Sequence, residues 1–222
     1  MLHKDEWLSQ YFTGGAYAYR KSADDKINQQ ITEGFIYTKV PLHAQKEVNE
    51  LIKDNFKLVE VSVSFEQKNL VQYPIRSTLI IDFVKLKEKQ AVIDIAKDAF
   101  LSSRLYQDSR IPYVLANQIK EDWVANYFTG QRGDTMIVAR LNEKIVGFLL
   151  LIKQTTIDLI AVSPDYYRMA IASSMIGFAN LNVGLLKAGT QLNNQAAIAM
   201  YIRCGFFLTE SYFILHKFVG ER

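Results

Sequence analysis

The chain has 222 residues, of which 49% are hydrophobic and 22% charged, and its formal net charge is +3. This composition is typical of a globular protein with a sizeable core, and it excludes a disordered chain. Lysines and arginines are scattered among acidic residues, so we expect no nucleic-acid or membrane-surface partner.

A single cysteine, Cys204, excludes a disulfide within the chain, and we expect a reduced, cytoplasmic setting. The three histidines and this cysteine lack metal-ligand spacing, so no metal is predicted. The first residues carry acidic side chains and do not resemble a signal peptide. The longest apolar run, residues 145–152, is too short to span a bilayer.

The first third of the chain predicts a strand at 34–42, an amphipathic helix at 43–56 and an alternating strand at 57–65. A polar break follows at 67–73, just before Pro74, and we place a domain boundary there. The prediction is a small N-terminal α/β domain, residues 1–75, and a second domain, residues 76–222. We expect the first domain to support the acceptor site or a homodimer interface.

The second part predicts a strand at 76–86, helices at 90–101 and 112–130, and three strands within 134–162 joined by short polar turns. Helices are then expected at about 170–183 and at 194–206, and strands at 185–191 and 207–218. An antiparallel meander followed by a β-α-β-α-β tail indicates an α+β, or mixed α/β, fold rather than a doubly wound one.

The loop VSPDYYRMAIASSM, residues 162–175, joins an apolar strand to a helix. Backbone N–H groups at such a helix start can bind a pyrophosphate, and glycine lets the ligand approach. The positions that would suit glycine hold Arg168, Ala170 and Ala172. Alanine can serve there if φ stays negative, and Arg168 can add a cation. The alternative is an ordinary connection whose alanines pack the helix on the sheet.

This loop and a second motif together resemble the GNAT superfamily of N-acetyltransferases. The matching residues are Val162, Pro164, Tyr166 and Ile171, followed by Asn194, Ala197, Tyr201, Gly205 and Phe206. The family's arginine is replaced by Tyr167, and its glycines by Arg168, Ala170 and Ala172. A closer resemblance rests on Phe100, Ser103, Arg104, Tyr106 and Asp108, followed by Trp123 and Asn126. These residues look like the sugar-nucleotide amine acetyltransferases of that superfamily, the dTDP-fucosamine (4-amino-4,6-dideoxygalactose) acetyltransferases being the nearest group, and the similarity spans about residues 35–218.

The resemblance implies a central mixed, mostly antiparallel sheet that splays at the acyl-CoA site, with acetyl-CoA as cosubstrate. The pantetheine arm would lie in the splay, where a backbone N–H near Ala161 can act as an oxyanion donor. The residues implied to contact the coenzyme are Ala161, Val162, Tyr167, Arg168, Met169, Ala170, Ile171, Ala172 and Asn194.

Tyr201 stands where the family keeps its general acid, since a phenol is protonated at neutral pH and can donate a proton to a thiolate. The alternative is a core tyrosine on one helical stripe with Ala197 and Cys204. Asn194 can cap the helix while its amide faces the pantetheine, or serve as a cap alone. Asp158 is a candidate general base that would act through a water molecule. The alternative is that it is a polar strand residue that faces solvent.

For the acceptor, Arg104 can bind a nucleotide diphosphate and Asp108 the sugar hydroxyls or the amine. The alternative is a surface ion pair after a helix. Trp123 and Tyr127 are expected in the core rather than as a sugar platform.

The leading hypothesis is an acetyl-CoA-dependent N-acetyltransferase whose small-molecule acceptor is a nucleotide-linked amino sugar. A GNAT enzyme acting on another amine, from a protein or a small molecule, is the first alternative. A non-catalytic acyl-CoA-binding module is the second.

Overall fold

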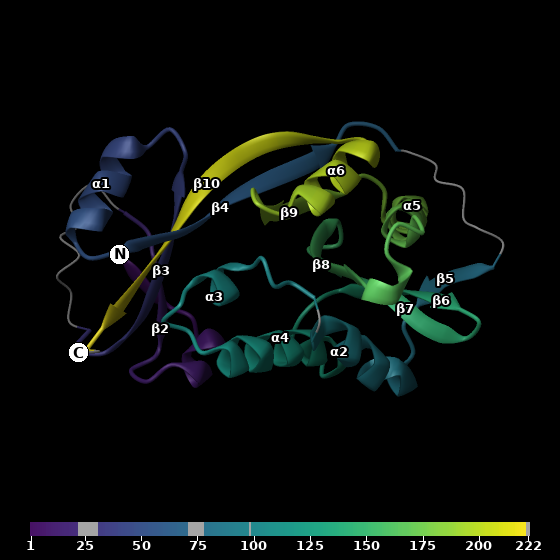
Figure 1. Cartoon of the computed structure of the whole chain (residues 1–222), viewed down its shortest axis with the longest axis horizontal. Coiled ribbons are helices and arrows are strands. Elements are labelled where there is room, and N and C mark those ends of the chain that lie inside the picture. Colours follow the sequence, from purple (N-terminus) through teal and green to yellow (C-terminus); the bar gives the residue numbers. More distant parts are fainter. Residues whose placement is uncertain (22–30, 71–77, 98, 221–222) are drawn as a thin grey trace.

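A computed structural model of the chain describes residues 1–21, 31–70, 78–97 and 99–220 (Figure 1). Within them, ten strands form one sheet in the order β1-β2-β3-β10-β4-β9-β8-β7-β6-β5. The strands are β1 (Leu2–Lys4), β2 (Ala16–Tyr19), β3 (Gly34–Pro41), β4 (Lys57–Gln67), β5 (Leu79–Phe83), β6 (Thr135–Leu141), β7 (Lys144–Ile152), β8 (Thr156–Val162), β9 (Lys187–Gln191) and β10 (Phe206–Val219).

The α-helices are α1 (Gln45–Lys53), α2 (Lys89–Lys97), α3 (Arg104–Gln107), α4 (Tyr113–Phe128), α5 (Ile171–Val183) and α6 (Gln195–Arg203). Short 3-10 turns are η1 (Leu8–Tyr11), η2 (Leu86–Glu88) and η3 (Pro164–Tyr166). Only the pairs β2–β3 and β8–β9 are parallel in the described sheet. The mixed, mostly antiparallel α/β fold that the sequence predicts is therefore confirmed.

Helices cover both faces of the central strands, with α5 and α6 on one face and α2 and α4 on the other (Figure 1). In β6, Ile137 packs on the α5 side and Met136 on the α2 side, and both are fully buried. Burial on two faces explains why β7 is an almost unbroken apolar run rather than an alternating one.

The predicted domain boundary near residue 75 lies outside the described residues. The sheet is continuous on either side of it, because β4 lies between β10 and β9 in the middle of the sheet. The N-terminal part of the chain therefore supplies a central strand to the same sheet as β5–β10.

Candidate functional site

The parallel strands β8 and β9 pair at only two positions, Thr156 with Lys187 and Ile157 with Ala188. Beyond these positions the two strands continue without pairing to each other. A bulge accompanies the separation, since the partner of Leu151 is Ile157 but that of Leu150 is Leu159, which leaves Asp158 without a partner on β7. The splay that the resemblance implies is thus present in the sheet.

A cavity of about 460 Å³ opens at this junction. Its walls come from the five strands β4, β7, β8, β9 and β10, and include Ser64, Asp158 and Gly189. Unpaired strand edges beside a cavity can accept an extended ligand as an additional strand.

The loop between β8 and α5 is left-handed at two places where glycine was expected. Arg168 has a φ of 62° and Ala170 a φ of 59°. The expectation that alanine serves here with negative φ is therefore wrong for Ala170, because the chain must turn sharply after η3 to enter α5. For residues with a Cβ this conformation costs about 1–2 kcal/mol each.

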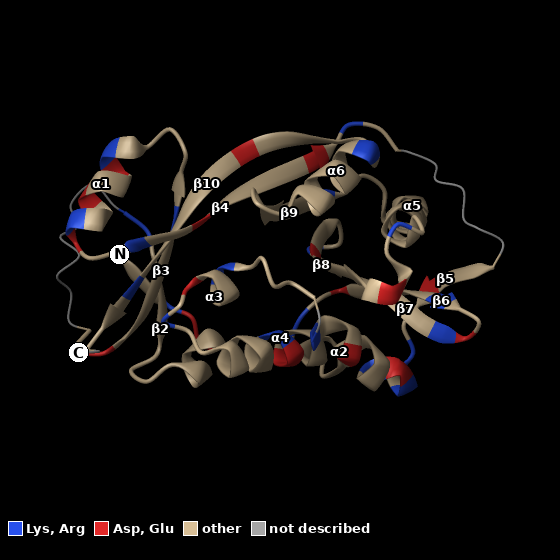
Figure 2. Ribbon diagram, viewed as in Figure 1, with Lys and Arg blue, Asp and Glu red and all other residues tan. Residues whose placement is uncertain are grey.

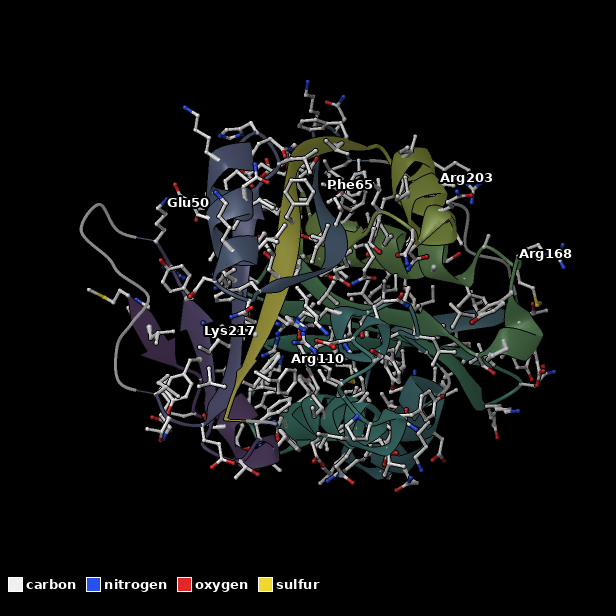
Figure 3. All side chains as sticks on the ribbon, turned by 60° about the vertical axis from the view of Figure 1, so that its left-hand side comes forward. Glu50, Phe65, Arg110, Arg168, Arg203 and Lys217 are labelled. Atoms are coloured by element: carbon white, nitrogen blue, oxygen red, sulfur yellow. The ribbon has the colours of Figure 1, made fainter. Side chains whose placement is uncertain are left out.

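The same geometry leaves the amides at the head of α5 available. Ala170 caps the helix without a side-chain hydrogen bond, and the first amide to find a carbonyl is that of Ser174, which donates to Ala170. In the described structure the amides of residues 168–173 donate to no backbone carbonyl. Ile171 turns its side chain into the core, whereas Arg168 lies at the surface (Figure 3). The loop thus offers N–H groups in the arrangement that binds anions.

Tyr201 lies on α6, on the same face of the sheet as α5, and is 2% exposed. Its ring centroid lies 5.6 Å from that of Phe65 and 5.1 Å from that of Phe206. Burial raises the pKa of the Tyr201 phenol, so the hydroxyl keeps its proton at neutral pH. Asn194 caps α6 by accepting a hydrogen bond from the Ala197 amide at 3.2 Å, as predicted.

Asp108 is buried, and its carboxylate is engaged within the protein. Arg110 donates two hydrogen bonds of 2.8 Å to it, and His216 Nδ1 lies 2.9 Å from Oδ2. Burial alone would raise the Asp108 pKa, but the hydrogen bonds from His216 and Arg110 outweigh it and hold the pKa well below its usual range. Both oxygens are therefore occupied without a substrate.

Arg104, by contrast, faces a second cavity of about 240 Å³ that is also lined by Tyr37 and Trp123. Its guanidinium carbon lies 4.3 Å from the Tyr37 ring centroid, and Nη1 lies 3.4 Å from His216 Nε2. Burial lowers the His216 pKa to about 4, so the imidazole is neutral. Its Nδ1–H then donates to Asp108 and its Nε2 accepts from Arg104, so the pair orients Arg104.

Asp158 does not face solvent, contrary to that expectation, since its side chain is 8% exposed. Arg132 donates two hydrogen bonds of 2.8 Å to the carboxylate, and Trp123 Nε1 donates a third of 2.8 Å. Trp123 packs in the core clusters as expected, but its edge also reaches the Arg104 cavity. A carboxylate held by three donors is a poor candidate for a base.

Two further titratable residues near the site were not found from the sequence. Burial raises the pKa of Glu60 on β4 to about 7, and burial lowers that of Lys120 on α4 to about 8. Glu60 occupies a polar position of an alternating strand, a pattern that normally assigns it to solvent. Nothing local in the sequence distinguishes such a residue, because α3 and α4 cover it only in the folded chain.

The described residues also bear on other classes of site. No group of three or more His, Cys, Asp and Glu side chains is placed to hold a metal ion there. None of the described helices has the length and apolar character needed to cross a membrane. In the described part of the chain, basic and acidic residues are scattered over the ribbon and lie among one another (Figure 2).

Parts of this chain are similar to known proteins. The family model of the acetyltransferase (GNAT) family matches residues 102–206. The spore coat polysaccharide biosynthesis protein SpsD of Bacillus subtilis is 33% identical over 144 residues, which are 60% of this chain and 49% of SpsD. The match thus spans about half the length of that relative.

Two solved structures show the same fold. One is a GCN5-related N-acetyltransferase from Sphaerobacter thermophilus, with a TM-score of 0.57 and 11% identity, covering 84% of this chain and 60% of that one. The other is a Drosophila protein with a TM-score of 0.62 and 10% identity, covering 100% of this chain and 74% of that one.

Proposed function

We propose that this chain transfers the acetyl group of acetyl-CoA to the amine of a nucleotide-linked amino sugar. The match of residues 102–206 to the model of the acetyltransferase (GNAT) family supports the acetyl transfer. The observation that carries the proposal is the separation of β8 from β9 after two paired residues. Beyond those two pairs the facing edges of β8 and β9 are not bonded to each other, and an extended pantetheine can add to them as a strand does.

In this proposal the coenzyme is held mainly by backbone groups. The pantetheine arm runs along Ala161 and Val162, with Asn194 on its other side. The pyrophosphate lies on the amides of residues 168–173, which donate to no backbone carbonyl, in the turn where Arg168 and Ala170 are left-handed. Arg168 contributes a cation, and Tyr167, Met169 and Ala172 complete the loop around the phosphates.

The thioester carbonyl would lie against the strand β8, where a backbone N–H near Ala161 stabilises the oxyanion. Tyr201 donates a proton to the departing CoA thiolate. Its buried, protonated phenol supports this role.

Two features support an amino-sugar acceptor. SpsD bears the name of a polysaccharide biosynthesis protein. Arg104 lies beside an aromatic-walled cavity and is oriented by His216, so that it can receive a phosphate of a sugar nucleotide. Asp108 would act on the acceptor through His216 and Arg104 rather than by direct contact.

The test is an acetylation assay with acetyl-CoA and dTDP-4-amino-4,6-dideoxygalactose, in which free CoA thiol and the mass of the product are followed. We expect an N-acetylated sugar nucleotide. Replacing Tyr201 by Phe should lower kcat by about 100-fold, because the thiolate loses its proton donor. Binding of acetyl-CoA should be retained.

Three outcomes separate the alternatives. Acetylation of other amines only would favour a different acceptor class. Binding of acetyl-CoA without turnover of any amine would favour the non-catalytic module. Full activity of Tyr201→Phe would remove Tyr201 from the mechanism.

A further inference from the structure

Buried polar atoms without a partner gather at one place in the described structure. The three side-chain atoms that are buried and make no hydrogen bond are Glu60 Oε2, Ser62 Oγ and Ser103 Oγ. Native proteins leave few such atoms, and each one calls for a missing partner such as a ligand or water. Three in one neighbourhood point to a polar ligand.

Gln191 connects Glu60 and Ser62 to the segment that contains Ser103. Glu60 and Ser62 are two positions apart on β4 and therefore share a face of the sheet. Ser62 lies opposite Gln191, the last residue of β9, and the Gln191 side chain bonds to both Glu60 and Ser102. Ser102 thus holds the segment containing Ser103 against β4 and β9, where α3 packs on β4.

This polar cluster of Glu60, Ser62 and Ser103 borders the splayed strands. Gln191 lies on β9 beyond its last pairing with β8, at the open side of the gap. Lys120 links the two sides, because its ammonium is close enough to both Glu60 and Asp158 for each to raise its pKa, and Asp158 occupies the bulge in β8. The cluster therefore lies beside the open side of the gap between β8 and β9.

We propose that the polar cluster binds the acceptor's primary amine and a neighbouring hydroxyl, with Glu60 receiving the amine's proton and Ser62 and Ser103 bonding the hydroxyl. This assignment rests on the proposed function. It gives the reaction a base that is not Asp158 and comes from the N-terminal part of the chain. It also specifies the acceptor as an amine that carries an adjacent hydroxyl, as an amino sugar does.

Every proton of the proposed acetyl transfer has a donor and an acceptor. The ammonium form of the acceptor gives one proton to the Glu60 carboxylate, which passes it to solvent. The free amine attacks the thioester carbonyl carbon, so the C–N bond forms and the C–S bond breaks. Tyr201 protonates the departing sulfur, and the second proton lost from nitrogen restores the phenol. The products are the amide, free CoA thiol and one released proton.

The charges around Glu60 suit this role. Arg104 on α3 and Lys120 on α4 face it and favour the carboxylate, whereas burial favours the acid, and Gln191 is its neutral neighbour. The balance leaves the Glu60 pKa at about 7. The group can thus both take and release a proton near neutral pH. Activity should fall as pH drops below this value, because the acid form cannot accept a proton.

The kinetic test uses the full chain with acetyl-CoA and dTDP-4-amino-4,6-dideoxygalactose. Glu60→Gln keeps the size of the side chain but cannot accept a proton, and we expect kcat to fall about 100-fold with an unchanged KM for acetyl-CoA and loss of the acid limb of the pH profile. Ser62→Ala and Ser103→Ala should raise the acceptor KM by about 3–10-fold with little effect on kcat. Glu50→Gln, on the surface of α1 (Figure 3), is the matched control and should behave as the parent.

A second measurement does not depend on turnover. With carboxyl-13C-labelled glutamate, the Glu60 resonance is identified by its loss in Glu60→Gln. D-galactosamine at tens of millimolar should shift this resonance, and D-galactose, which lacks the amine, should not.

The outcomes are distinguishable. If galactosamine leaves the Glu60 resonance unmoved, or if Glu60→Gln retains kcat and pH profile within twofold, the inference is overturned even when the parent acetylates the sugar nucleotide. If the resonance shifts but the parent transfers acetyl to no amine, the amine site stands and the proposed function fails.

Discussion

His216 is a fully buried histidine whose protonation ties the stability of the folded chain to pH. It is 0% exposed, and burial lowers its pKa to about 4 from an ordinary value of 6.5. Between these two values the unfolded chain binds a proton that the folded chain does not. Stability from this group is therefore complete above pH 6.5 and is lost as pH falls toward 4.

We predict that the titration of His216 alone lowers the free energy of unfolding by on the order of 3 kcal/mol as the pH falls from 6.5 to 4. His216→Asn, whose amide can still donate to Asp108, should flatten this part of the profile. His43→Gln, a change at an exposed histidine, should leave it as in the parent. Chemical denaturation at a series of pH values measures the effect, and an unchanged slope in His216→Asn would contradict it.

Single residues also show which contacts could be predicted from the sequence and which could not. The Asn194 cap was predictable because the capping partner is three residues away. The contacts of Asp158 and Glu60 were not, because their partners Arg132, Lys120 and Gln191 come from distant elements. A polar residue on a strand has solvent as its default neighbour, and only the packing of other helices changes that.

At the scale of elements, the turn from β8 into α5 is the segment that differs most from the expected motif. Two residues with side chains hold left-handed conformations there, which glycine adopts without strain. The loop therefore holds this backbone conformation at a cost in stability. Such strain is tolerated where the surrounding structure fixes the backbone.

Ala170→Gly should consequently raise the free energy of unfolding by about 1 kcal/mol, since it relieves the positive φ. Ala172→Gly is the matched control. It lies inside the first turn of α5 without a positive φ, so glycine there should lower stability, by up to about 1 kcal/mol. Thermal and denaturant unfolding of both variants would show the opposite signs. Destabilisation by Ala170→Gly would contradict the account of the loop.

Elements with a strong period were predictable, and short ones were not. The helices α1, α2, α4, α5 and α6 follow the predicted segments, because each has an apolar stripe or buried face of several turns. The helix α3, which carries Arg104, has four residues. That length is too short for a helical spacing of apolar residues to be recognised in the sequence. The strands β1 and β2 also went unpredicted.

At the scale of the whole molecule, the N-terminal part of the chain is built into the same sheet as β5–β10. β4 separates β9 from β10, and its two faces differ in role. One face carries Phe65, which packs on Tyr201, and the other carries Glu60 and Ser62. The two proposed proton-transfer residues therefore lie on opposite sides of the central strands, with the splayed gap between β8 and β9 beside them.

The fold class followed from the order of strands and helices, but this insertion of β4 did not. Sequence order suggests that a segment before residue 75 forms a unit of its own. Strand pairing is a long-range property, and nothing in the alternation of β4 specifies which strand lies beside it.

The most direct test of the account is a calorimetric titration of the full chain with acetyl-CoA, repeated with S-acetylpantetheine, which lacks the pyrophosphate. We predict saturable binding of acetyl-CoA at one site, tighter than that of S-acetylpantetheine by about 100-fold, as charge-assisted bonds to several amides imply. No heat of binding with millimolar acetyl-CoA, or equal affinity for the two ligands, would contradict the claim that the backbone at the head of α5 holds the coenzyme.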